Sequence, residues 1–116
     1  MDVRSRMRRR EIMRITIIGS TSYQGKMKMH KDELENKGHE VSLPAFDNFD
    51  GMNELQVCDY NRRKIEWADE IHVIWDQRSI GTVFDLGMSF ALKKKVKVIY
   101  LNQKTFPNFL TQYANS

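Results

Sequence analysis

Residues 14–26 read "RITIIGSTSYQGK", and this stretch decides the fold class. The apolar run at 14–19 is rich in β-branched residues and stops at Gly19, as is typical of a strand buried in a sheet. From about residue 25 to residue 37 the sequence turns to Lys, Met, Glu and Leu, which favour helix, and Gly38 stands where a helix commonly ends. The stretch therefore predicts one strand–loop–helix unit whose loop carries small hydroxyl side chains.

The same alternation continues to the end of the chain. Further strands are predicted at 40–45, 70–75 and 96–101, and further helices at 54–68, 82–95 and 105–114. Alternation of this kind predicts a single α/β domain with four or five parallel strands and helices on both faces. Ligands of such sheets bind at the carboxyl ends of the strands, so a site is expected among the loops at 19–25, 47–53 and 76–81.

Composition limits the classes of function. The chain has 116 residues, of which 41% are apolar and 29% charged, which fits one globular domain. No apolar run approaches the ~20 residues that a membrane span needs. The single cysteine, Cys58, excludes an internal disulfide and fits a reducing compartment. We therefore expect a cytoplasmic protein without a membrane partner.

The positive charge is confined to the start of the chain. The net charge is +4, and residues 1–10 hold five arginines against one acidic residue, whereas the rest carries 14 basic and 14 acidic residues. A short, highly charged segment buries too little apolar surface to order itself. Residues 1–12 are therefore expected to be a basic, disordered leader and residues 13–116 the folded domain, and nucleic acid is not an expected partner.

The loop after the first strand nearly spells a triphosphate-binding loop, but its spacing excludes one. Gly19 and Gly25 enclose five residues where that motif has four, and Met27 stands where a magnesium-binding hydroxyl belongs. Three small hydroxyl side chains remain: Ser20, Thr21 and Ser22. With the N–H groups of a helix start they could hold a phosphate or sugar hydroxyls, or the segment could be a plain turn between strand and helix. Both interpretations stay open.

The second candidate motif is "TVFDLG" at 82–87. Thr82 and Asp85 have the spacing of an N-terminal capping box, and from spacing alone this structural role is favoured. Alternatively, the helix dipole at the mouth of a parallel sheet keeps Asp85 ionised, and an ionised carboxylate beside a sugar can attack its anomeric carbon. The three histidines, at positions 30, 39 and 72, lack ligand spacing, so neither a metal site nor a cofactor is expected.

Taken together, these patterns resemble the nucleoside 2-deoxyribosyltransferase superfamily, which includes the 2′-deoxynucleoside 5′-monophosphate N-glycosidases. The resemblance covers about residues 14–102. It lies in a strand ending "IGS", a helix with Asn61 leading into "WADEIHVIWD", and the run "SIGTVFDLGMSFALKKKVKVIYLN". The resemblance implies a flavodoxin-like, Rossmann-like domain that forms homodimers or larger homo-oligomers, in which a neighbouring subunit completes each site.

The resemblance also implies a mechanism and a set of site residues. In that superfamily a carboxylate at the start of the third helix attacks C1′ and displaces the base, and water or a second base then takes the sugar. Carried over, the nucleophile falls on Asp85. The residues expected to bind the sugar or phosphate, or to orient the nucleophile, are Gly19, Ser20, Thr21, Tyr23, Asn61, Ser79, Gly81 and Thr82.

The sequence departs from the superfamily pattern at three positions. The usual nucleophile is glutamate, and Asp85 is one methylene shorter. The neutral Asn61 replaces an acidic residue, and Thr16 stands where an orienting tyrosine is common, a role that Tyr23 could take over. Three functions therefore remain: cleavage or transfer at the N-glycosidic bond of (deoxy)nucleosides or their 5′-monophosphates, catalytically silent nucleotide binding or sensing, and cleavage of another nucleotide, such as NAD or a cytokinin-type riboside monophosphate. All three have a small-molecule nucleoside or nucleotide as partner.

Overall fold

The structure is a computed structural model that describes residues 12–45, 51–102 and 106–115. In chain order the elements are β1 (Arg14–Gly19), the 3-10 turn η1 (Thr21–Tyr23), α2 (Gln24–Asn36), β2 (Glu40–Ser42), α3 (Glu54–Trp67), β3 (Glu70–Trp75), α4 (Ile80–Ala91), β4 (Lys95–Leu101) and α5 (Phe106–Ala114). The expected basic leader, apart from residue 12, lies outside the described residues, as does part of the loop expected at 47–53.

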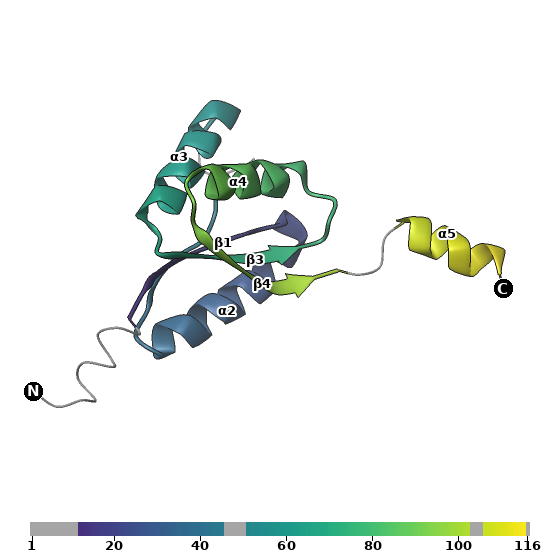
Figure 1. Ribbon diagram of the computed structural model, residues 1–116, viewed down its shortest axis with the longest axis horizontal. Helices are drawn as coiled ribbons and strands as arrows, with labels where there is room; N and C mark the ends of the chain where they lie inside the picture. The colour runs from purple at the N-terminus through teal and green to yellow at the C-terminus, as the bar shows by residue number, and fades with distance from the viewer. Residues whose placement is uncertain (1–11, 46–50, 103–105, 116) are drawn as a thin grey trace, which may run out of the picture.

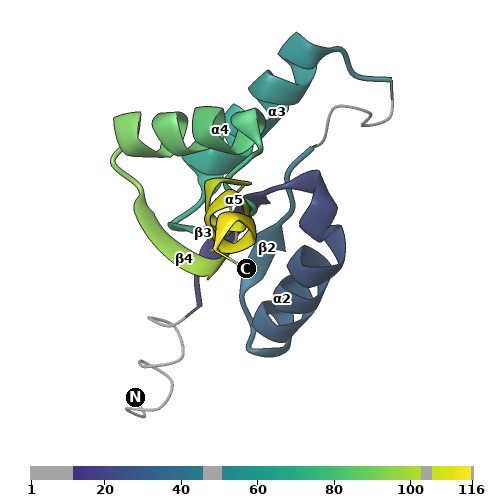
Figure 2. The ribbon, with the colours of Figure 1, turned by 90° about the vertical axis from the view of Figure 1, so that its right-hand side faces the viewer.

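The strands form one four-stranded sheet in the order β2-β1-β3-β4, and every neighbouring pair is parallel. Helix α2 covers one face of the sheet, and α3 and α4 cover the other (Figures 1 and 2). The strand order reverses between β1 and β3, because the chain leaves β1 toward one edge and returns from β2 to the other side of β1. The expected parallel α/β fold is confirmed, and its reversal point predicts where a ligand binds.

The strands contribute to a separate apolar cluster on each face of the sheet. On the α2 face, Ile17 and Ile74 pack with Met27 of α2. On the other face, Ile18 and Val73 pack in a cluster that also includes residues of α3, with partly buried side chains of α4 against it. Each fully buried aliphatic side chain of this size contributes about 1.5–3 kcal/mol, so the two clusters hold the helices against the sheet.

Two predicted boundaries were wrong. Strand β2 ends at Ser42 instead of residue 45, since Pro44 has no N–H with which to extend the ladder. Helix α4 begins at Ile80 and ends at Ala91, whereas 82–95 was expected. Its end follows from Lys93, which has a positive φ of 57° and turns the chain into β4.

The predicted capping box at the start of α4 was also wrong. Ser79 is the N-cap residue, and its hydroxyl oxygen accepts the N–H of Thr82. Asp85 therefore lies in the second turn of the helix and closes no box. The C-terminal glycine predicted for α2 is confirmed, because Gly38 has a φ of 96° and donates its N–H to the carbonyl of Glu35.

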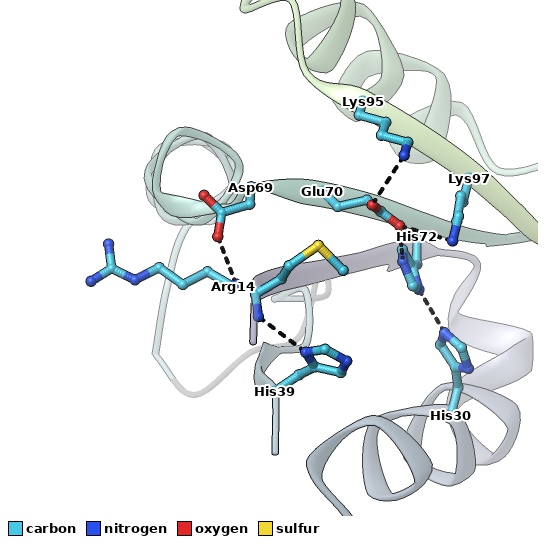
Figure 3. A network of polar contacts seen from close by, with 9 residues as sticks. Arg14, His30, His39, Asp69, Glu70, His72, Lys95 and Lys97 are labelled. Carbon is cyan, nitrogen blue, oxygen red and sulfur yellow. Dashed lines mark hydrogen bonds and ion pairs between the residues drawn. The ribbon is translucent and has the colours of Figure 1, made fainter. Parts of the chain in front are cut away.

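Two histidines that are far apart in the sequence meet on the α2 face of the sheet (Figure 3). His30 Nε2 lies 2.7 Å from His72 Nδ1, and His72 Nε2 lies 2.8 Å from Glu70 Oε1. Burial lowers the pKa of both imidazoles. Burial alone would raise the pKa of Glu70, but its hydrogen bond with His72 and the charges of Lys97 and Lys95 hold it below the usual value. The network joins α2 to β3 at the amino end of the strand, away from the carboxyl-end loops.

The last strand and the last helix complete the described chain. β4 is an edge strand whose side chains are largely exposed; the side chain of Val98, for example, is 62% accessible. Helix α5 stands apart from the sheet in Figure 1. Among the described residues, no helix combines the length and the apolar composition that crossing a membrane requires.

Candidate functional site

A cavity of about 380 Å³ lies at the carboxyl end of the sheet, next to the reversal point of the strand order. Its polar lining residues come from the loops after β1 and β3 and from α3 and α4: Thr21, Asn61, Arg78, Ser79, Thr82 and Asp85. The remaining lining residues are glycines and apolar or weakly polar side chains: Gly19, Pro44, Ala45, Val57, Cys58, Ile80, Gly81 and Phe84. A cavity of this size, lined by apolar side chains and a few polar groups, fits a small organic ligand.

Asp85 is the buried acid of this cavity. Its side chain is 7% exposed, and within the described part of the chain its carboxyl group has neither a hydrogen bond nor an ion pair. Burial raises the pKa of Asp85 to about 7. The expectation that the helix dipole keeps this carboxylate ionised was therefore wrong, because the dipole acts mainly on the first turn and Asp85 lies in the second. Both protonation states of Asp85 are populated near neutral pH.

The loop between β3 and α4 is shaped by Asp76. Its Oδ1 accepts the N–H groups of Arg78 and Ser79 at 2.8 and 2.9 Å, and its Oδ2 accepts the hydroxyl of Ser22 at 3.2 Å. Burial alone would raise the pKa of Asp76, but these hydrogen bonds and that with Ser20 hold it below its usual value. Asp76 is thus an ionised anchor that fixes the backbone from which Arg78 and Ser79 reach the cavity.

Ser79 presents a hydroxyl group with a free proton at the start of α4. Its Oγ accepts the Thr82 hydroxyl at 3.1 Å and the Thr82 N–H at 3.4 Å, while its carbonyl accepts the indole N–H of Trp75 at 3.2 Å. A hydroxyl that already accepts two hydrogen bonds keeps its own proton for a further acceptor. Of the two predicted residues, Thr82 is fully buried and orients Ser79, and Ser79 is the one placed to donate to a ligand.

The loop after β1, which carries Ser20, Thr21 and Ser22, mainly holds neighbouring backbone segments together. A Cβ added to Gly19 would lie 1.9 Å from the carbonyl oxygen of Ile74, so the close approach of β1 to β3 requires glycine here. Ser20 is 1% exposed; its N–H donates to the Ile74 carbonyl, and its hydroxyl oxygen accepts the N–H of Asp76. Gly19 and Thr21 line the cavity, but the predicted binding residue Ser20 instead ties the first loop to the third.

Asn61 lines the cavity, but its amide group is already engaged. Its Oδ1 accepts the N–H of Ala45 at 2.8 Å, and its Nδ2 donates to the carbonyl of Ala45 at 3.2 Å. An aspartate at position 61 would present an oxygen to the Ala45 carbonyl and could not donate a hydrogen bond to it. The amide of Asn61 therefore has a structural role at this position. Thr16 is likewise internal, since its hydroxyl donates to the carbonyl of Lys64 at 2.7 Å.

Tyr23 does not reach the cavity. It packs against the apolar cluster on the α2 face, with its ring edge-on to Tyr100 at a centroid distance of 5.2 Å. Burial and the neighbouring Tyr100 raise its pKa. Asp85 lies on α4, which covers the opposite face of the sheet, so Tyr23 is not placed to orient it.

The cavity lining also includes residues that were not predicted as site residues, among them Cys58, Arg78 and Phe84. A signal was available for Arg78, because it is the one basic residue in the loop at 76–81, which was already expected to carry chemistry. Cys58 and Phe84 reach the cavity only through the packing of α3 and α4, which sequence spacing does not reveal.

Other parts of the described chain offer less specific chemistry. No group of three or more His, Cys, Asp or Glu side chains within 12–45, 51–102 and 106–115 is arranged to hold a metal ion. A larger hollow of about 700 Å³ lies along the edge strand β2, between α2 and α3. Its two glutamates, Glu35 and Glu40, are paired with Lys31 and Arg14, so it contains no isolated buried acid comparable to Asp85.

Comparison with known proteins supports the fold. The chain matches no protein-family model and no curated protein sequence. It is similar to the solved structure of the CMP N-glycosidase BcmB of Clostridium botulinum, with 21% sequence identity, a TM-score of 0.55, and a match covering 89% of this chain and 99% of that one. The match shows that this chain shares its fold with that enzyme, and it confirms the α/β fold expected from the sequence.

Proposed function

We propose that this protein cleaves the N-glycosidic bond of nucleosides or their 5′-monophosphates, with Asp85 as the nucleophile. The observation that carries the proposal is the carboxyl group of Asp85, which is buried in a ligand-sized cavity without a partner in the described chain. An unpaired buried acid costs stability, so its retention at the mouth of a parallel sheet favours a chemical role over a structural one. The similarity to the fold of a CMP N-glycosidase supports the same reaction class.

The proposed step is a displacement at C1′ of the sugar. A carboxylate oxygen of Asp85 forms a bond to C1′ while the bond from C1′ to the base nitrogen breaks, and the base departs with the electron pair. Water then attacks C1′, the bond between C1′ and the Asp85 oxygen breaks, and Asp85 returns as the carboxylate; the proton that the water loses balances the proton that the departed base takes up. Apolar lining residues such as Val57 and Phe84 suit the base, and the donor hydroxyl of Ser79 suits the sugar or phosphate oxygens.

The test is release of free base. The protein is incubated with ribo- and deoxyribonucleosides and their 5′-monophosphates, and the products are separated by chromatography. We expect free base and the corresponding sugar or sugar phosphate from at least one pair of substrates. Binding without any base release would favour the silent nucleotide-binding protein. If the protein neither binds these compounds nor releases base from them, the proposal as a whole is contradicted.

The pH dependence of the reaction is a separate prediction. The nucleophile must be ionised, and the pKa of Asp85 is about 7. We therefore expect kcat/KM to rise about tenfold per pH unit below pH 7 and to level off above it. Rates are measured from pH 5 to pH 9 with a nucleoside as well as its monophosphate, because a phosphate group itself titrates near pH 6. A rate that is constant or falls across this range with the nucleoside would contradict the assignment.

We also predict that the protein forms a dimer or a larger homo-oligomer. Ile80 and Phe84 line the cavity and are 83% and 55% exposed, and Phe90 on the same helix is 85% exposed. A second copy packed on this side of α4 would cover the exposed apolar surface and narrow the cavity mouth. Light scattering at micromolar concentration is expected to give at least twice the chain mass; a monomer would contradict this prediction.

A further inference from the structure

Helix α2 is attached to the sheet by a narrow stripe of side chains. Of its thirteen residues only Met27 and Leu34 are buried, and His30 lies between them at the spacing of one helix face. From this position His30 contacts a second imidazole, that of His72 on β3. A charge on this histidine pair would therefore lie in the middle of the contact between α2 and the sheet.

The hydrogen bonds of the network determine which ring nitrogens carry protons. Glu70 is ionised, because Lys97 and Lys95 lie 3.5 and 3.8 Å from its carboxylate oxygens. The 2.8 Å contact between His72 and Glu70 Oε1 therefore requires that His72 donate its Nε2–H. A neutral His72 then has no proton on Nδ1, so His30 donates its own Nε2–H across the 2.7 Å between the rings (Figure 3). With both rings neutral, the network is fully paired.

The histidine pair has room for one further proton but not for two. A first proton binds Nδ1 of His30, which takes no part in the contact, and leaves the hydrogen bond between the rings in place. A second proton has to bind Nδ1 of His72, where it meets the Nε2–H of His30 at a nitrogen–nitrogen distance of 2.7 Å. Two imidazolium rings with centroids 5.0 Å apart also repel each other. The doubly charged pair therefore separates.

Burial and the surrounding charges decide how readily the histidine pair takes up protons. Burial lowers the pKa of both rings. At His72 the nearby Glu70 acts in the opposite direction, and the charge of Lys97 adds to the lowering. The other titratable groups that act on the network are Glu33 and Lys37 of α2, Lys95 of β4 and His39, which precedes β2. β1 places Ile15 and Ile17 opposite the two polar residues of β3, and neither carries a charge.

We propose that the pair of His30 and His72 is a pH-sensitive switch, which holds α2 against the sheet while it is neutral and releases the helix when it takes up a second proton. The proposal does not rest on the reaction at Asp85, because α4 covers the opposite face of the sheet. Since the pKa values of both histidines lie below 6.5 in the folded protein, the released form binds more protons than the docked form. The attachment of α2 is therefore fully present above about pH 6.5 and is lost as the pH falls below it.

The test is amide hydrogen exchange of α2 between pH 7.5 and pH 5, corrected for the intrinsic exchange rate. In the native protein we expect protection of α2 amides to fall below about pH 6.5, by up to about tenfold per pH unit, while amides of α4 keep theirs. His30→Gln keeps an N–H donor for His72 but does not titrate, and its amide can turn to accept a hydrogen bond from a protonated His72. In this variant the loss of α2 protection in acid should disappear. His39→Gln makes the same change at the third histidine and should keep the loss.

Each of the other outcomes overturns the switch. These are a native protein whose α2 protection does not depend on pH, a loss that persists in His30→Gln, and a loss that disappears in His39→Gln. A second measurement needs no variant, because ¹⁵N NMR spectra distinguish the two neutral forms of a histidine ring. Above pH 7.5 both His30 and His72 should carry their proton on Nε2. A proton on Nδ1 of either ring would contradict the arrangement from which the switch follows, even if His30→Gln fails to fold.

Discussion

Asp85→Asn is expected to lose base release by about 10³-fold or more while the protein still folds and binds nucleotide. An amide cannot form the bond to C1′, and only the orienting groups of the cavity remain to accelerate the reaction. Asn is nearly the same size as Asp, so the cavity keeps its shape. The measurement is kcat for free base by chromatography, together with the affinity of the variant for the monophosphate.

Controls distinguish the nucleophile from a general effect on the fold. Asp32→Asn makes the same carboxylate-to-amide change at an exposed position of α2 and should leave kcat unchanged. Asp85→Glu gives the carboxylate the length that is usual in the superfamily that the sequence resembles. It is expected to raise kcat if the cavity of about 380 Å³ accommodates the added methylene. Robust activity in Asp85→Ala would exclude this residue as the nucleophile.

The fold was predictable because its signals are local. The strand at 70–75 is buried on both faces, since it packs against α2 on one side and α3 and α4 on the other, and four of its six residues, Ile71, Val73, Ile74 and Trp75, are apolar. The start of α4 was less certain, because Ser79 and Thr82 are both common N-cap residues. In the structure Ser79 is the N-cap residue, and the hydroxyl of Thr82 donates a hydrogen bond to the Ser79 hydroxyl.

The candidate site was predictable only in part, because side-chain direction depends on contacts between distant segments. Ser20 and Thr21 are equivalent in the sequence, yet Ser20 turns inward to the N–H of Asp76, 56 residues further along, and Thr21 faces the cavity. Burial of Asp85 also depends on packing, and burial changed its expected protonation state. Helix position alone had indicated an ionised group, whereas burial of the carboxyl group decides the pKa.

The second large effect is expected on stability, where Asp85→Asn should make the protein more stable at alkaline pH. The pKa of Asp85 is raised from 3.8 to about 7 in the folded protein. Between these values the folded state binds more protons than the unfolded state, so the contribution of Asp85 to stability falls as the pH rises through this window. The loss is complete above about pH 7 and amounts to at most about 4 kcal/mol.

Asn does not titrate, so the difference in unfolding free energy between Asp85→Asn and the native protein isolates this contribution. The unpaired amide has a cost of its own, about 1–3 kcal/mol, but that cost is the same at every pH. We therefore expect the difference to move in favour of the variant by about 2–4 kcal/mol between pH 4 and pH 8, measured by urea unfolding. A difference that does not change with pH would show that the carboxyl group is solvated in the folded protein. In that case Asp85 would be ionised throughout, and the predicted rise of kcat/KM toward pH 7 would fail with it.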